Sequence, residues 1–128
     1  MQFTEGTYEE AKKYCVRDGG VKKQGPWHDL SSCWLNWSYM RLSPSDSIEM
    51  TSAYLHAKVN DLVNKFNLDV SIKVKQKMAA GIHLCGVNRV ERHLKNKNLD
   101  IGLCGSHRFG DYVKKLSYFK KVFASFER

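Results

Sequence analysis

The chain has 128 residues, a formal net charge of +8 and an aromatic content of 12%. This length and composition are typical of one folded domain, residues 1–128, with a core that needs no cross-links. They exclude a membrane-spanning protein, because no apolar run is long enough for a span. We also expect no secretion signal, and therefore a cytoplasmic protein. Its four cysteines are then expected to be free thiols, metal ligands or a nucleophile rather than a disulfide framework.

Charge is unevenly distributed along the chain. Residues 1–64 carry 7 Lys and Arg against 8 Asp and Glu, whereas residues 65–128 carry 14 against 5. The net charges of the two halves are therefore −1 and +9, and such asymmetry indicates a polyanionic partner. We expect nucleic acid, either RNA or DNA, with an acidic protein surface as the alternative and no membrane partner.

The first element predicted is a helix. Thr7-Tyr-Glu-Glu10 has the pattern of a capping box, and the helix is expected to run to about Asp18. Gly19-Gly20 would end it, because glycine adopts the left-handed conformation of a helix C-cap. Residues 19–30 are rich in Gly and Pro and are expected to form a loop.

Two further elements complete the first half. Residues 31–40 have apolar residues at helical spacing and a serine for the N-cap, which favours a helix. Their aromatic content is also compatible with a strand, so that alternative is kept. Ser43-Pro44 then places a capping residue before a proline at the first helical position. We expect a long amphipathic helix from there to about Phe66.

The second half is predicted to contain a sheet. Asp69–Lys75 alternates apolar and polar residues, which indicates a half-buried strand with Lys73 and Lys75 on its outer face. Residues 82–89 and 101–108 are similar to one another, and each reads as a strand, a Cys-Gly turn and the start of a helix. We therefore expect strands at 82–85 and 99–103, parallel in one sheet, with reduced Cys85 and Cys104 at the same edge.

The last predicted helix spans roughly residues 109–126 and is amphipathic. We expect it to bury Phe109, Val113, Leu116, Phe119, Val122 or Phe123, and Phe126. Four lysines, Lys114, Lys115, Lys120 and Lys121, are expected to be exposed. The fold class is thus α+β: N-terminal helices, then a small sheet with two strand–turn–helix units and a C-terminal amphipathic helix.

One segment resembles a protease family. Val21-Lys-Lys-Gln-Gly25 followed by Ser32-Cys33-Trp34 is similar to the papain-type pattern, and Cys33-Trp-Leu-Asn36 is similar to the nucleophile segment of picornavirus leader proteases. The resemblance implies that Cys33 is a nucleophile, that Gln24 stabilises the oxyanion, and that His83 or His107 is the base. Whether the chain is an enzyme is left open.

Histidine and cysteine also have a metal-binding alternative. His83 with Cys85, and Cys104 with His107, would supply four ligands for tetrahedral zinc if the two predicted strands were neighbours. Two buried, unliganded cysteines are the commoner outcome. We therefore expect no cofactor, with zinc as the alternative.

Basic residues with aromatic neighbours point to nucleic acid. Arg89-Val-Glu-Arg-His93 resembles the Arg-x-x-x-His signature of small single-stranded nucleic-acid-binding domains, and glycine turns before Arg89 and Arg108 suit an anion. Tyr112 and Tyr118 offer rings for stacking on bases. The candidate nucleic-acid-binding residues are Lys73, Lys75, Arg89, Arg92, His93, Lys95, Arg108, Lys114 and Lys121.

The favoured function is therefore that of a small basic polyanion-binding protein, with nucleic acid as its partner. The alternatives are a papain-like cysteine protease and a module that binds an acidic protein surface. Regulatory or host-directed factors of viruses and mobile elements have a similar make-up, and such an origin is a hypothesis.

Overall fold

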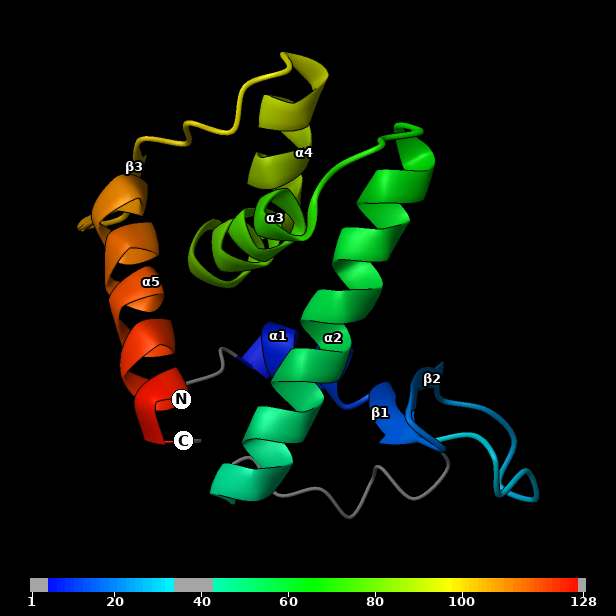
Figure 1. Cartoon of the computed structure of the whole chain (residues 1–128). Helices are drawn as coiled ribbons and strands as arrows, with labels where there is room; N and C mark the ends of the chain where they lie inside the picture. Colours follow the sequence, from blue (N-terminus) through cyan, green and yellow to red (C-terminus); the bar gives the residue numbers. More distant parts are fainter. Residues whose placement is uncertain (1–4, 34–42, 127–128) are drawn as a thin grey trace. The chain divides into compact units, whose positions relative to one another are not determined.

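The computed structural model describes residues 5–33 and 43–126 (Figure 1). The chain divides into two compact units, Met1–Asp61 and Leu62–Arg128, and we describe each by itself. The expectation of one domain over residues 1–128 remains a prediction. None of the helices within the described ranges is sufficiently long and apolar to cross a membrane.

The first unit begins with helix α1 (Glu5–Ala11), followed by a hairpin of strands β1 (Tyr14–Arg17) and β2 (Gly20–Lys23). Asp18 and Gly19 form the turn, with φ of 51° and 72°. Positive φ at both central residues is the hairpin geometry that Asp-Gly favours. The predicted helix to Asp18 is therefore wrong beyond Ala11, because the turn chemistry prevails there.

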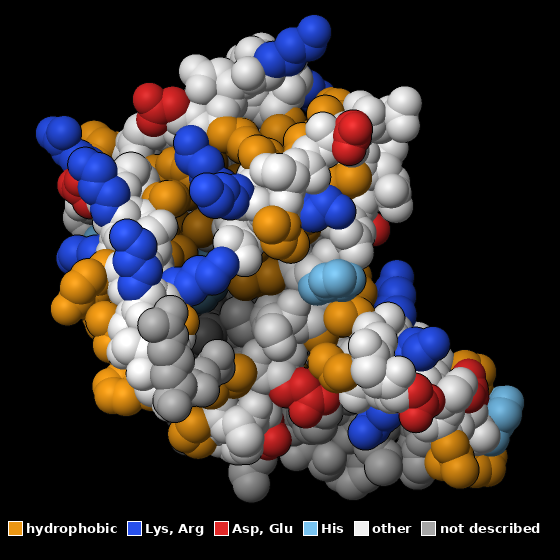
Figure 2. Space-filling model, in the orientation of Figure 1, with side chains coloured by type: hydrophobic (Ala, Val, Ile, Leu, Met, Phe, Trp, Pro, Cys, Tyr) orange, Lys and Arg blue, Asp and Glu red, His pale blue; other side chains and the backbone are white. Residues whose placement is uncertain are grey.

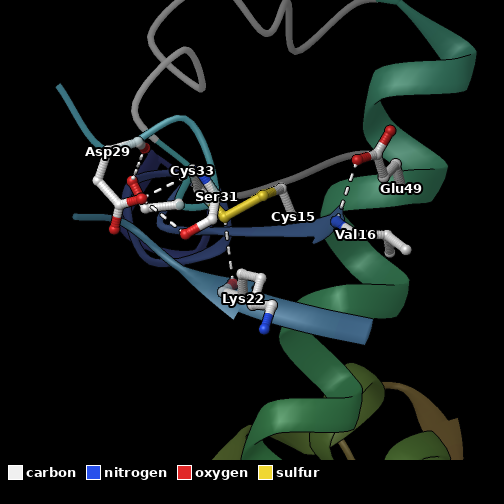
Figure 3. The surroundings of a disulfide bond; sticks show 8 residues. Cys15, Val16, Lys22, Asp29, Ser31, Cys33 and Glu49 are labelled. Atoms are coloured by element: carbon white, nitrogen blue, oxygen red, sulfur yellow. Dashed lines mark hydrogen bonds between the residues drawn. A yellow bond between two sulfur atoms is a disulfide. The ribbon is translucent and has the colours of Figure 1, made fainter. Parts of the chain in front are cut away.

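A disulfide between Cys15 and Cys33 ties the loop after β2 to the hairpin (Figure 3). Neither cysteine has any exposed surface. The loop is held locally as well, because the Asp29 carboxylate accepts hydrogen bonds from the backbone N–H and the hydroxyl of Ser31, at 3.0 and 2.6 Å. The expectation of free thiols is thus wrong for Cys15 and Cys33. The loop after β2, which is made of polar and turn residues, brings them together.

Helix α2 (Pro44–Lys65) confirms the prediction of a long helix after Ser43-Pro44. The Ser43 hydroxyl accepts a hydrogen bond from the Asp46 N–H at 3.5 Å, as expected of an N-cap. Near the middle of α2, the Tyr54 ring meets Tyr14 of β1 edge-on, with centroids 6.1 Å apart. Most of the element predicted at 31–40 lies outside the described residues.

The second unit contains helices α3 (Ile72–Cys85) and α4 (Val87–Lys95), a short hairpin of β3 (Leu103–Cys104) and β4 (His107–Arg108), and helix α5 (Phe109–Phe126). Helix α3 contacts both α4 and α5 (Figure 1). The α+β class and the C-terminal helix, with its predicted limits, are confirmed.

The strands predicted at 69–75 and 82–85 are wrong, because both segments lie largely or wholly in α3. The Ser71 hydroxyl caps this helix by accepting a hydrogen bond from the Val74 N–H. Val74, Met78 and Ile82 recur every four residues, a helical period that outlasts the short alternation before it. The predicted parallel sheet is also wrong, since β3 pairs antiparallel with β4.

Close packing around Gly81 organises the second unit. A Cβ atom at this position would lie 2.9 Å from both Ile101 Cδ1 and Val90 Cγ2, and 3.6 Å from the Phe109 ring. Ile101, Val90 and Phe109 are all buried. Glycine in the interior of α3 therefore allows α4, the loop before β3 and the start of α5 to meet at one point.

Candidate nucleic-acid interface

A second disulfide joins the end of α3 to β3. Cys85 and Cys104 are 19 residues apart in sequence, with Cα atoms 5.2 Å apart. The prediction that these residues lie close together is confirmed. The prediction that they are reduced, at one edge of a parallel sheet, is wrong, because Cys85 ends a helix and faces a hairpin. The loop that this disulfide closes contains all of α4.

The zinc alternative finds no support at this place. Cys85 and Cys104 are bonded to one another, so neither sulfur is a thiolate in this form. In the parts of the chain that the structure describes, three or more potential metal-ligating side chains do not come together. His83 instead contacts an aromatic ring of α5, and His107 is exposed on β4.

The residues that resemble a protease site are divided between the two units. Cys33 and Gln24 belong to the first unit, whereas His83 and His107 belong to the second. The Cys33 sulfur is bonded to Cys15, and its side chain is fully buried. A nucleophilic thiolate at Cys33 would therefore require reduction of this disulfide.

Contacts between α3 and α5 position the basic residues of the second unit. The His83 ring stacks on the Tyr112 ring, with centroids 6.4 Å apart. The Lys120 ammonium donates a hydrogen bond to the Gln76 side-chain oxygen at 3.3 Å. Together these contacts place the two helices side by side, with the beginning of α5 next to the end of α3.

One side of α5 is basic and exposed. Lys114 and Lys121 are seven residues apart and so project from nearly the same side of a helix. Tyr118 lies between them and is 64% exposed. Figure 2 shows Lys and Arg side chains gathered over α5 and neighbouring helices of this unit, with hydrophobic side chains among them.

The apolar side of α5 is buried only near its beginning. Phe109 is buried as predicted, but Leu116, Phe119 and Phe123 are 42%, 51% and 66% exposed, and Phe126 is exposed as well. Their predicted burial is wrong in this structure. The core around Gly81 engages the first turn of α5, whereas the later turns extend beyond it.

Helix α4 presents a second group of basic side chains. Arg89 and Arg92 are three residues apart, and His93 follows Arg89 by four, so all three lie on neighbouring positions of the helix surface. Lys95 is partly neutralised, because Glu91 pairs with Lys65 at 2.8 Å and with Lys95 at 3.8 Å. The hydrogen bond from Lys65 holds the pKa of Glu91 below its ordinary value.

The remaining predicted residues lie on α3 and β4. Lys73 and Lys75 are predicted on one face of a strand, but both lie on α3. Residues two apart on a helix are separated by about 200° around its axis, so these two lysines project from different sides. Lys73 is exposed and Lys75 half-buried. Arg108 is exposed at the end of β4, directly before α5.

This chain matches no protein-family model, no curated protein and no solved structure. The candidate site is therefore described from its own residues: the lysines of α5, the arginines of α4 and the exposed rings of α5.

Proposed function

We propose that the second unit binds nucleic acid and that α5 is the centre of the interface. The observation that carries the proposal is the exposure of lysine and aromatic side chains side by side on this helix. The unit has 14 Lys and Arg against 5 Asp and Glu, a net charge of +9. Phosphates are attracted by such a shared positive field, and binding releases their counterions.

The arginines of α4 supply the second half of the proposed interface. A guanidinium forms two parallel hydrogen bonds with a phosphate, whereas an ammonium acts as a point charge. Arg92 is exposed, and Arg89 is half-buried beside it. We assign Arg89 and Arg92 to phosphate contacts that orient the nucleic acid. The lysines of α5 are assigned to the less directional attraction between positive charge and the phosphates.

The proposal is tested by removing charge from one unit at a time. The double variant Lys114→Gln, Lys121→Gln loses two exposed charges from α5. The matched control, Lys22→Gln with Lys23→Gln, loses two exposed charges from β2 in the first unit. Both variants have the same net charge, so they separate a local interface from bulk charge.

Binding of a fluorescent oligonucleotide at low salt is measured by anisotropy for wild type and both variants. We expect the α5 variant to bind about tenfold or more weakly and the control to stay within about twofold of wild type. Equal losses in the two variants would contradict a local interface. Failure of the wild type to bind any RNA or DNA would reject the proposed function.

The two disulfides weigh against the cytoplasmic location expected from the sequence. Cytosolic thiols are kept reduced, so stable disulfides are uncommon there. Lysis of cells under denaturing conditions in the presence of an alkylating reagent, followed by mass measurement, reports the redox state of all four cysteines, because Cys15 and Cys33 are inaccessible in the folded chain. Four alkylated cysteines would support a cytoplasmic protein, whereas unmodified cysteines would place nucleic-acid binding in an oxidising compartment.

A further inference from the structure

We propose that the nucleic acid bound by α5 is single-stranded and that its bases stack on the rings of Tyr118, Phe119 and Phe123. This inference rests on the proposed function and identifies the form of the polyanion. Its starting point is the exposure of these three rings, at 64%, 51% and 66%. Large exposed apolar side chains that gather on one element mark an interaction site.

Each ring has lysines at neighbouring positions of the helix. Lys114 and Lys121 are four residues before and three residues after Tyr118, and both are exposed. Residues three or four apart on a helix have Cβ atoms about 5–6 Å apart. The arrangement thus places a flat ring between two cations, a combination that suits a base together with its flanking phosphates.

The same combination recurs on the apolar side of α5. Lys115 precedes Phe119 by four residues, and Lys120 precedes Phe123 by three. Lys120 is also held in place by its hydrogen bond to Gln76 of α3. A strand that follows α5 would therefore meet rings and cations on both sides of the helix.

Duplex nucleic acid does not make use of these rings. Its bases are already stacked on one another, so a protein contacts phosphates and groove edges. The lysines of α5 would attract a duplex and a single strand alike, but only unstacked bases would cover the rings. A preference for single strands is the expected consequence.

A second copy of this chain is a less suitable occupant of the same face. Helix α5 contains four lysines and a single carboxylate, Asp111. Two α5 helices packed through their apolar sides would bring lysines close to lysines, and like charges repel. Tyr112 is not part of the proposed stacking surface, because its ring face already stacks on His83, whereas the rings of Tyr118 and Phe119 meet edge-on.

The test replaces rings without removing apolar surface. In Phe119→Leu with Phe123→Leu, the side chains stay apolar but lose the flat face that stacks on a base. Trp27→Leu is the matched control, because Trp27 is an exposed ring in the first unit. Circular dichroism verifies that each variant keeps its helical content, which substitution of exposed side chains should preserve.

Anisotropy is measured with a labelled single strand of about 20 nucleotides and with the matching duplex, since binding sites of this kind cover several nucleotides. We expect the wild type to prefer the single strand by about tenfold or more, and the leucine variant to bind the single strand alone about tenfold more weakly. The Trp27→Leu control should keep the preference.

Equal affinity of the wild type for single strand and duplex, or equal binding by the leucine variant, would overturn the stacking inference while leaving nucleic-acid binding intact. Absence of binding to both forms would overturn the function and the inference together. Self-association of the wild type in sedimentation, without oligonucleotide binding, would likewise overturn both and favour a protein contact.

Discussion

The imidazole ring of His83 on α3 stacks on the phenol ring of Tyr112 on α5, with centroids 6.4 Å apart. The contact helps to fix α5 beside α3 and thereby sets the direction in which its lysines project. It also desolvates both rings. Burial lowers the pKa of His83 and raises that of Tyr112, although part of His83 remains exposed.

The pKa of His83 gives a prediction about pH. An unfolded histidine titrates near about 6.5, and the folded pKa of His83 is lower. As pH falls below about 6.5, the unfolded chain therefore binds this proton before the folded chain does, so His83 lowers stability on acidification. In an NMR titration the His83 ring should titrate below about 6.5. A midpoint at or above that value would contradict burial against Tyr112.

Two glycines in helices should respond in opposite ways to alanine. At Gly81 the new Cβ would crowd Ile101 and Val90, so Gly81→Ala should lower the free energy of unfolding by about 1–3 kcal/mol. Gly110 in α5 has open space at its Cβ position. Gly110→Ala should raise the free energy of unfolding by about 0.5–1 kcal/mol, because alanine is the better helix former. Unfolding by denaturant measures the free energy of unfolding of both variants. A Gly81→Ala variant that is more stable than wild type would refute the close packing around Gly81.

The Cys85–Cys104 disulfide should stabilise the second unit. It closes a loop with a sequence separation of 19, for which restriction of the unfolded chain contributes about 3 kcal/mol. Cys85→Ser with Cys104→Ser should therefore lower the free energy of unfolding by about this amount. Cys15→Ser with Cys33→Ser is the parallel variant, with a separation of 18. Unchanged unfolding in both would show that the cysteines are not paired in solution.

The sequence predicted the long helices better than the short elements. The start of α2 follows from its capping residue, and the extents of α2 and α5 follow from apolar spacing sustained over many turns. The β1–β2 hairpin was missed although Asp18-Gly19 is a strong hairpin signal. Helix α3 was missed as a whole, because a short alternation at 69–75 and the similarity of residues 82–89 to 101–108 both favour strands, whereas the longer helical period through Val74, Met78 and Ile82 prevails.

For the candidate site, the exposure of the charged side chains could be predicted from the sequence, whereas the exposure of the apolar side chains could not. Exposure of Lys114 and Lys121 follows from their side of α5. Exposure of Phe119 and Phe123 does not follow from the sequence, because spacing defines an apolar side and only packing decides how much of it is covered. The disulfides were missed because sequence spacing does not report the distance between two cysteines in the fold.

The arginines of α4 should contribute phosphate contacts. Arg89→Ala with Arg92→Ala should weaken nucleic-acid binding and reduce the salt slope by about 1 for each arginine–phosphate pair removed. Lys95→Ala is the control, because Lys95 is paired with Glu91 and its removal should matter less. Circular dichroism verifies that the double variant keeps its helical content, because Arg92 is exposed but Arg89 is half-buried. An unchanged salt slope in the double arginine variant would remove α4 from the interface.

The central claim, that the second unit binds nucleic acid through its positive charge, is tested most directly by the salt dependence of binding. Each phosphate contact contributes about −0.7 to −0.9 to the slope of log K against log salt. With about four such phosphates neutralised, the affinity of the wild type for an oligonucleotide should fall more than tenfold between about 50 and about 150 mM salt. An affinity that stays constant over this range, or no binding at the lower salt concentration, would contradict the claim.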